Sequence, residues 1–207
     1  MASSALQVAS IYWGGSFIDP DEAAAEVTAT AKLAELLASL GSTEMVIGGG
    51  RKRPEGNRRA DYDWMAQVLN QIGQNARRLG LRACYHPHSG TCVQTGADID
   101  LLMSITDPDL VYLCPDVAHL AGGGADPAAY IEKYLPRVGY VHLKDLSPDG
   151  RFVELGQGWV DLPRVLAVLK RGSYQGWLTV ELDVSIRSPR ESAEISLRFL
   201  EKQGVMA

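Results

Sequence analysis

The chain has 207 residues, of which 46% are hydrophobic and 22% are charged, and its formal net charge is −5. This is the composition of an ordinary globular protein, and it excludes a disordered tail, a collagen-like chain and a disulfide-stapled miniprotein. The acidic balance provides no basic footprint for nucleic acid or for an anionic membrane, so we expect neither as a partner. The length suits a single domain over residues 1–207.

The cysteine pattern and the apolar runs predict where the protein resides. Cys84, Cys92 and Cys114 show no CxxC spacing, which favours free thiols in a reducing compartment. No apolar run is long enough for a transmembrane helix, and the first residues lack the positive charge of a secretory signal. We therefore expect a cytoplasmic protein.

Short apolar runs alternate with longer helical stretches along the chain. Strands are expected at residues 6–13, 45–47, 81–86, 110–116, 139–145 and 177–183. Helices are expected at residues 19–40, 61–79, 96–105, 127–134, 162–171 and 189–203. Continuous apolar runs are typical of strands buried on both faces, as in parallel sheets. The pattern predicts an α/β fold of six strand–helix units, as an open doubly wound sheet or a barrel. Neither glycine-rich stretch, at 48–50 or 122–124, has the spacing of a nucleotide-binding loop.

The chain has only four histidines, and each comes at or just after the carboxyl end of an expected strand: His86, His88, His119 and His142. Active sites of parallel α/β folds form at that edge. Side chains two residues apart share a face of a strand, so His86 should face the same way as His88, and His142 the same way as Lys144.

The same alternation predicts a layer of ionisable groups. If the four strands are neighbours in a barrel, His86, Asp116, His142 and Glu181 face its interior together. Two imidazoles and two carboxylates form a suitable set of ligands for a divalent metal. The alternative is a buried polar network in which the histidines pair with the carboxylates, because four unpaired ionisable groups would be costly to bury.

Four motifs at these strand ends carry a resemblance to a known family. They are Tyr-His-Pro-His-Ser-Gly-Thr at 85–91 with Gln94-Thr95, Leu-Cys-Pro-Asp-Val-Ala-His-Leu at 113–120, Val-His-Leu-Lys-Asp at 141–145 and Val-Glu-Leu-Asp at 180–183. Together they resemble the xylose isomerase-like barrel superfamily, and most closely its inosose dehydratase-like members. The resemblance implies a (β/α) TIM-type barrel of eight strands, incomplete here because the two N-terminal units are missing. The first strand would then have an open edge, which a homo-oligomer would cover.

The resemblance also implies roles for single residues. Asp116, His142 and Glu181 would be metal ligands, and His86 stands where many epimerases have a glutamate ligand. Glu181 would double as a catalytic acid or base, with His86 or His88 as the second such group.

Substrate contacts follow from the same resemblance and from strand position. His119 would contact a substrate oxygen, and Lys144 and His88 would face the substrate. Trp13, at the end of the first expected strand, is a candidate for stacking on a sugar face, with packing as the alternative.

The implied activity is that of a metal-dependent sugar isomerase or epimerase, which removes the proton next to the carbonyl of a ketose or sugar phosphate. Mn²⁺ is the expected cofactor, with Co²⁺, Mg²⁺ or Zn²⁺ as alternatives. Two other functions stay open: an inosose dehydratase-type lyase and a catalytically inactive sugar-binding barrel. In each case the partner is a small-molecule sugar or cyclitol.

Overall fold

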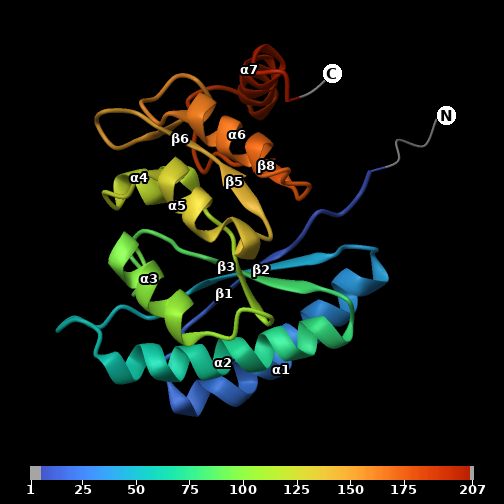
Figure 1. Ribbon diagram of the computed structural model, residues 1–207, viewed down its shortest axis with the longest axis vertical. Helices are drawn as coiled ribbons and strands as arrows, with labels where there is room; N and C mark the ends of the chain where they lie inside the picture. Colours follow the sequence, from blue (N-terminus) through green and yellow to red (C-terminus); the bar gives the residue numbers. More distant parts are fainter. Residues whose placement is uncertain (1–5, 206–207) are drawn as a thin grey trace.

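Strands and helices alternate along the computed structural model, which describes residues 6–205 (Figure 1). The successive strands and helices are β1 (Tyr12–Gly15), α1 (Pro20–Ser39), β2 (Glu44–Gly49), α2 (Arg59–Arg78), β3 (Arg82–His86), α3 (Gly96–Ile105), β4 (Val111–Leu113), α4 (Val117–Gly122), α5 (Pro127–Tyr134), β5 (Val141–Leu143), β6 (Asp145–Leu146), β7 (Phe152–Val153), α6 (Leu162–Arg171), β8 (Leu178–Val180) and α7 (Pro189–Lys202), with a short 3-10 helix, η1 (Leu135–Arg137), before β5. The predicted alternation of strands and helices is confirmed. Helix α4 and the β6–β7 hairpin are additions that the sequence pattern did not indicate.

Local chemistry explains where the helices begin and end. Asp19 caps α1 by accepting a hydrogen bond from the amide of Asp21, and Pro20 occupies the first turn, where its missing N–H costs nothing. Gly41 follows α1 with a φ of 77°, a conformation that favours glycine. Ser188 and Glu191 form a reciprocal capping box at the start of α7. No helix within residues 6–205 is long and apolar enough to cross a membrane.

The strands are mostly parallel, as their continuous apolar runs predicted. β1, β2, β3 and β4 form one sheet in that order, and β5 pairs in parallel with β8. Isolated parallel bridges, from Leu113 to Val138 and from Asp116 to His142, join the two groups. Within the described part of the chain, β1 pairs only with β2 and β8 only with β5, so the strands do not close into a barrel. The description as a barrel lacking its first two units stays an interpretation.

Side chains on the two faces of this curved sheet pack into different clusters. One large cluster lies between β1–β4 and helices α1–α3, and it includes Leu37, Ile47 and Leu69. A second lies around β5, α5 and α6. Val46, Cys84, Cys114 and Tyr140 form a small cluster on the opposite face of the strands. The inner face is therefore apolar below the row of residues that carries the candidate site.

The strands expected at 110–116 and 177–183 are longer than β4 and β8, and two other expected strands differ further from those observed. The first strand was expected at 6–13, but β1 spans Tyr12–Gly15. The described segment before Tyr12 contacts β2 through a side-chain hydrogen bond and does not form the backbone hydrogen bonds of a strand pair. Ser10 Oγ accepts a hydrogen bond from Val46 N at 3.0 Å.

The run expected at 139–145 divides into β5 and β6. β6 pairs antiparallel with β7, and the Asp145 carboxylate accepts backbone N–H bonds from Leu146, Gly156 and Gly158. These bonds turn the chain back on itself, which ends the parallel strand.

Candidate metal centre

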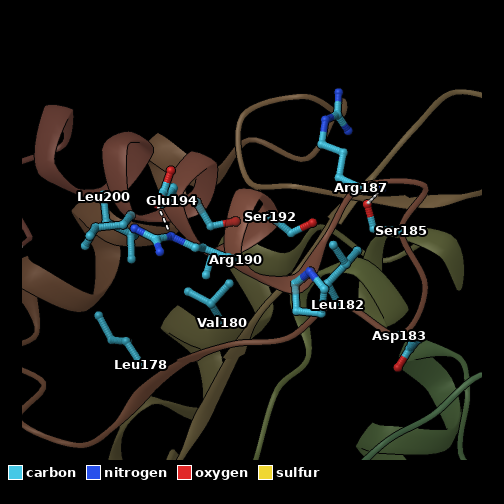
Figure 2. A pocket seen from close by; sticks show the side chains of 14 residues that line it. Leu178, Val180, Leu182, Asp183, Ser185, Arg187, Arg190, Ser192, Glu194 and Leu200 are labelled. Carbon is cyan, nitrogen blue, oxygen red and sulfur yellow. Dashed lines mark hydrogen bonds and ion pairs between the residues drawn. The ribbon is translucent and has the colours of Figure 1, made fainter.

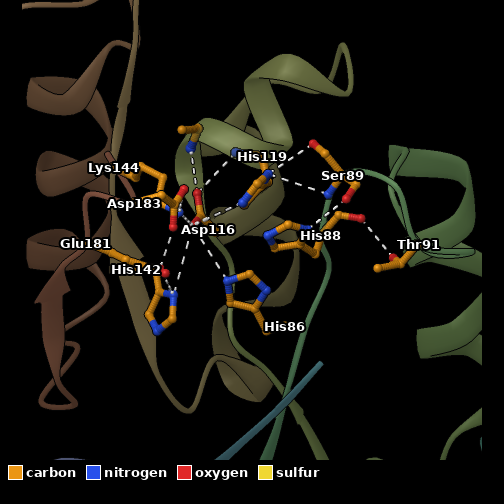
Figure 3. Close-up of polar contacts among 11 residues, drawn as sticks. His86, His88, Ser89, Thr91, Asp116, His119, His142, Lys144, Glu181 and Asp183 are labelled. Carbon is orange, nitrogen blue, oxygen red and sulfur yellow. Dashed lines mark hydrogen bonds and ion pairs between the residues drawn. The ribbon is translucent and has the colours of Figure 1, made fainter. Parts of the chain in front are cut away.

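Four side chains from separate segments meet at the carboxyl ends of the strands (Figure 3). His86 is the last residue of β3, Asp116 lies between β4 and α4, His142 is the middle residue of β5, and Glu181 follows β8. One ligand atom from each residue lies within 4.8 Å of the others. The structure thus brings together the four residues that strand alternation placed in one layer.

The buried donor atoms in this cluster fit a cation. Asp116 Oδ2, His142 Nδ1 and Glu181 Oε2 are buried, and no hydrogen bond satisfies them among the described residues. His142 Nδ1 and Glu181 Oε2 are only 2.6 Å apart, but the geometry is not that of a hydrogen bond. Buried polar atoms without partners are costly, and a divalent ion would satisfy all of them at once. The set of two imidazoles and two carboxylates therefore fits a metal better than a closed polar network.

Asp116 uses its two carboxylate oxygens for different tasks. Oδ1 caps α4 by accepting hydrogen bonds from the amides of Ala118 and His119, at 2.9 and 3.1 Å. Oδ2 points into the cluster, 3.6 Å from His86 Nε2. Burial alone would raise the pKa of Asp116, but His86, His119 and Lys144 around it lower that pKa instead. The residue is therefore held as a carboxylate, which is the form that binds a cation.

Glu181 is also held in its charged form. Burial alone would raise its pKa, but His142 and Lys144 beside it lower the pKa of Glu181 to about 2. Its side chain is about one-third exposed, unlike that of Asp116. Glu181 is therefore the carboxylate of the cluster that a bound molecule can reach.

Lys144 does not face open space. Its side chain has no exposed surface, and its Nζ lies 3.0 Å from Asp183 Oδ2, 3.4 Å from Asp116 Oδ2 and 3.5 Å from Glu181 Oε2 (Figure 3). The ammonium group neutralises part of the carboxylate charge from behind the cluster. Its expected contact with the substrate stays a prediction.

A second histidine pair lies beside the cluster. The rings of His88 and His119 are 3.9 Å apart, and His119 Nε2 is 3.9 Å from Asp116 Oδ2. Burial lowers the pKa of His119 to about 4, so its imidazole is neutral near pH 7. Nδ1 of His119 lies 3.0 Å from Ser89 Oγ and 3.5 Å from the Ser89 amide, which donates to it. The other ring nitrogen, Nε2, is buried and has no hydrogen-bond partner among residues 6–205.

Trp13 lies on the wrong face of β1 for the stacking role proposed from sequence. It pairs with Ile47 in the sheet and packs against the helix-side cluster. Tyr12 is the residue that faces inward, with its ring centroid 5.9 Å from that of His86. Burial raises the pKa of Tyr12, and the charge of Glu181 adds to that shift. The expected strand boundaries did not settle which of the two aromatic residues points to the site, so sequence reasoning missed Tyr12.

An apolar groove lies on the other side of β8 (Figure 2). Its volume is about 820 Å³, and Leu178, Val180 and Leu182 line it together with residues of α7. Glu181 alternates with these residues along the strand, so it points to the opposite face. Asp183, which pairs with Lys144 beside the cluster, also lines the groove, so the groove borders the cluster at that residue.

Comparison with known proteins decides the family. A family model described as a xylose isomerase-like TIM barrel matches residues 2–203. This chain belongs to that family. The inosose dehydratase of Clostridium botulinum (strain Alaska E43 / Type E3) is 35% identical over 163 residues, which cover 69% of this chain and 55% of that protein. The inosose dehydratase of Geobacillus kaustophilus (strain HTA426) is 30% identical over 230 residues, covering 95% of this chain and 75% of that protein.

A solved structure of the same xylose isomerase-like fold also matches. It is an IolI protein with a bound zinc atom, with a TM-score of 0.76, 18% sequence identity and coverage of 96% of this chain and 75% of that one. This structural similarity supports the assignment of the same fold to this chain. The chain spans about half the length of the first curated relatives that it matches.

Proposed function

We propose that this chain carries the active site of an inosose dehydratase-type lyase that depends on a divalent metal. The observation that supports the proposal is the convergence of ligand atoms from His86, Asp116, His142 and Glu181 in a chain 35% identical to an inosose dehydratase. Those of Asp116, His142 and Glu181 are buried without a hydrogen-bond partner among the described residues. These relatives favour the dehydratase alternative over the isomerase or epimerase that the motifs first indicated. Mn²⁺ is the ion we expect, and Zn²⁺ is the first alternative because the related IolI structure holds zinc.

The four cluster residues would hold the ion, and Glu181 would also act on the substrate, together with His88 and His119. A divalent ion at this place would polarise the ketone of an inosose and make the neighbouring C–H more acidic. Glu181, charged and partly exposed, would accept that proton. The hydroxyl on the next carbon would leave as water, with its extra proton supplied by His88 and its departure assisted by His119.

The position of His86 argues against epimerisation with two carboxylate bases. Such a reaction needs one base on each face of the substrate, whereas His86 is 2% exposed and its imidazole is turned towards Asp116. Burial lowers the pKa of His86. Dehydration needs only one base and one acid, and Glu181 with the His88–His119 pair supplies both.

The test is turnover by the purified protein, stripped of metal and then loaded separately with Mn²⁺, Co²⁺, Mg²⁺ or Zn²⁺. With an inosose we expect metal-dependent loss of the mass of one water, detected by mass spectrometry. Glu181→Gln should lower kcat by about 10²-fold or more, because the base is lost. Glu194→Gln, which changes an exposed carboxylate on α7, is the matched control.

Other outcomes identify the alternatives. Exchange of a substrate C–H for solvent deuterium without loss of water would favour the isomerase or epimerase. Binding of metal and inosose with no reaction at all would favour the inactive sugar-binding barrel.

A further inference from the structure

Tyr12 is an inward-facing aromatic residue with no role in the metal cluster. In the sheet register, Tyr12 is level with Val46 and Cys84, one step below the row of Gly14, Gly48 and His86. Its side chain rises from the lower row toward the site, where its ring meets the edge of the His86 ring at 80°. Tyr12 is 49% exposed, so the ring is not enclosed by the protein.

Two glycines make room for this ring. A Cβ atom added at Gly48 would lie 2.6 Å from the Tyr12 hydroxyl, and one added at Gly14 would lie 3.3 Å from Tyr12 Cε1. Any other residue at Gly48 would therefore push the ring away from its place. The two glycines lie in the same row as His86. Because they have no side chains, the Tyr12 ring can lie over this part of β1 and β2.

The Tyr12 hydroxyl is also unengaged. The hydroxyls of Tyr85 and Tyr140 take part in hydrogen bonds with Gly49 O and Thr179 Oγ1, at 2.7 and 2.6 Å. No group within residues 6–205 makes a hydrogen bond with the Tyr12 hydroxyl. A half-exposed tyrosine offers an apolar ring face together with one polar group, which suits a polyhydroxylated ring with C–H and O–H groups.

We propose that Tyr12 is a substrate-binding residue, whose ring packs on the C–H face of the cyclitol and whose hydroxyl donates a hydrogen bond to one of its oxygens. This inference rests on the proposed function. It assigns a substrate contact to the side of the site next to β1, where the metal ligands and the histidine pair provide none. Tyr12 binds and orients the substrate and takes no part in proton transfer.

The test compares Tyr12→Phe, Tyr12→Leu and Gly48→Ala with Trp13→Phe, a matched change on the opposite face of β1. For the inosose that the wild-type protein turns over with Mn²⁺, loss of one hydrogen bond in Tyr12→Phe should raise KM about three- to tenfold. Loss of the ring in Tyr12→Leu should raise KM further. In both variants kcat should stay within about twofold, since uniform binding affects KM alone. Trp13→Phe should leave KM unchanged.

A double-mutant cycle tests the geometry itself. Gly48→Ala should raise KM in the wild-type background, but it should have little effect in the Tyr12→Leu background, where the clashing ring is gone. Equal effects in the two backgrounds, or KM values within about twofold of wild type for both Tyr12 variants, would overturn the proposal. A parallel loss of Mn²⁺ affinity, measured by calorimetry with Mn²⁺ alone, would show a structural role and would also overturn it. Absence of wild-type turnover is a different result: it removes the proposed function, and this inference with it.

Discussion

Among the residues that the structure describes, Lys144 is the one lysine or arginine buried with the carboxylates of the cluster. Its Nζ lies within 3.5 Å of three carboxylate oxygens, two of which belong to the proposed metal ligands. Removing one partner of a buried ion pair leaves the other charge uncompensated, whereas a divalent ion would restore the balance.

We therefore expect Lys144→Met to affect the metal-free protein most. Without metal it should lose about 3–5 kcal/mol of unfolding free energy, as measured by urea denaturation in the presence of a chelator. With saturating Mn²⁺ the loss should be smaller, and the affinity for Mn²⁺ should rise because a competing positive charge is gone. A loss of the same size in both states would contradict this account.

Strand alternation predicted the grouping of His86, Asp116, His142 and Glu181, because the parallel alignment extends to all four. His86 and His142 lie in parallel strands, Glu181 directly follows β8, and Asp116 forms an isolated parallel bridge with His142. The same reasoning failed for Trp13, since the strand was expected to begin at residue 6 and the apolar residues before β1 gave no clear period. Strand alternation also could not predict which side chains contact one another. The burial of Lys144 depends on where Asp183 lies, which sequence does not specify.

The β6–β7 hairpin and the loop after β8 are tied together by one buried carboxylate. Glu154, which follows β7, is 2% exposed and accepts hydrogen bonds from Ser185 Oγ, Ser192 Oγ and Arg187 Nη1, each at 2.8 Å. Burial alone would raise the pKa of Glu154, but these donors lower it to about 2. The contact therefore joins two loops at the rim of the strands through a group that remains charged at neutral pH.

This contact should make stability depend on acid pH. Because the pKa of Glu154 is lower in the folded state than its ordinary 4.5, its contribution is present above that value and is lost as pH falls towards 2. Glu154→Gln should lose roughly 1–3 kcal/mol of unfolding free energy at about pH 7, and much less at about pH 2.5. Urea denaturation at the two pH values measures this, with Glu194→Gln as control. An equal loss at both pH values would refute the assignment.

Short elements were the part of the fold that the sequence did not reveal. Helix α4 has six residues and begins directly after its N-cap, Asp116, which was assigned only as a ligand. The spacing from Asp116 to His119 could have indicated a helix cap, since the carboxylate accepts from the amides that follow it. Strands β6 and β7 have two residues each, too few for any period. The long helices, with clear capping residues and wide apolar faces, were predicted to within a few residues.

The metal cluster lies where two parts of the molecule meet. β3 belongs to the sheet that packs on α1–α3, whereas β5 and β8 form the other parallel pair. An ion bound to His86 on one side and His142 on the other would link the two, so metal binding should stabilise the fold as a unit.

Thermal unfolding should report this link. At about a hundred times its dissociation constant, a divalent ion that binds only the folded state adds about 2.7 kcal/mol of stability. Differential scanning fluorimetry should show a melting temperature that rises with Mn²⁺ concentration, and Asp116→Asn should abolish the rise. A rise of the same size in Asp116→Asn would place the ion elsewhere.

The unpaired edges of β1 and β8 are relevant to oligomerisation. Each has a neighbour on one side only within the described residues, and Val180 beside the apolar groove is 37% exposed. Open strand edges invite pairing with another chain, so the homo-oligomer expected from sequence stays a prediction.

The proposed ligand residues lie between positions 86 and 181, in or after β3, β4, β5 and β8, while Tyr12, Gly14 and Gly48 lie on β1 and β2. On the proposed function, the groups that react and the groups that select the substrate therefore lie in different stretches of the polypeptide. A chimera that exchanged only the first fifty residues for those of a relative would inherit a new preference among polyols and keep its own ion.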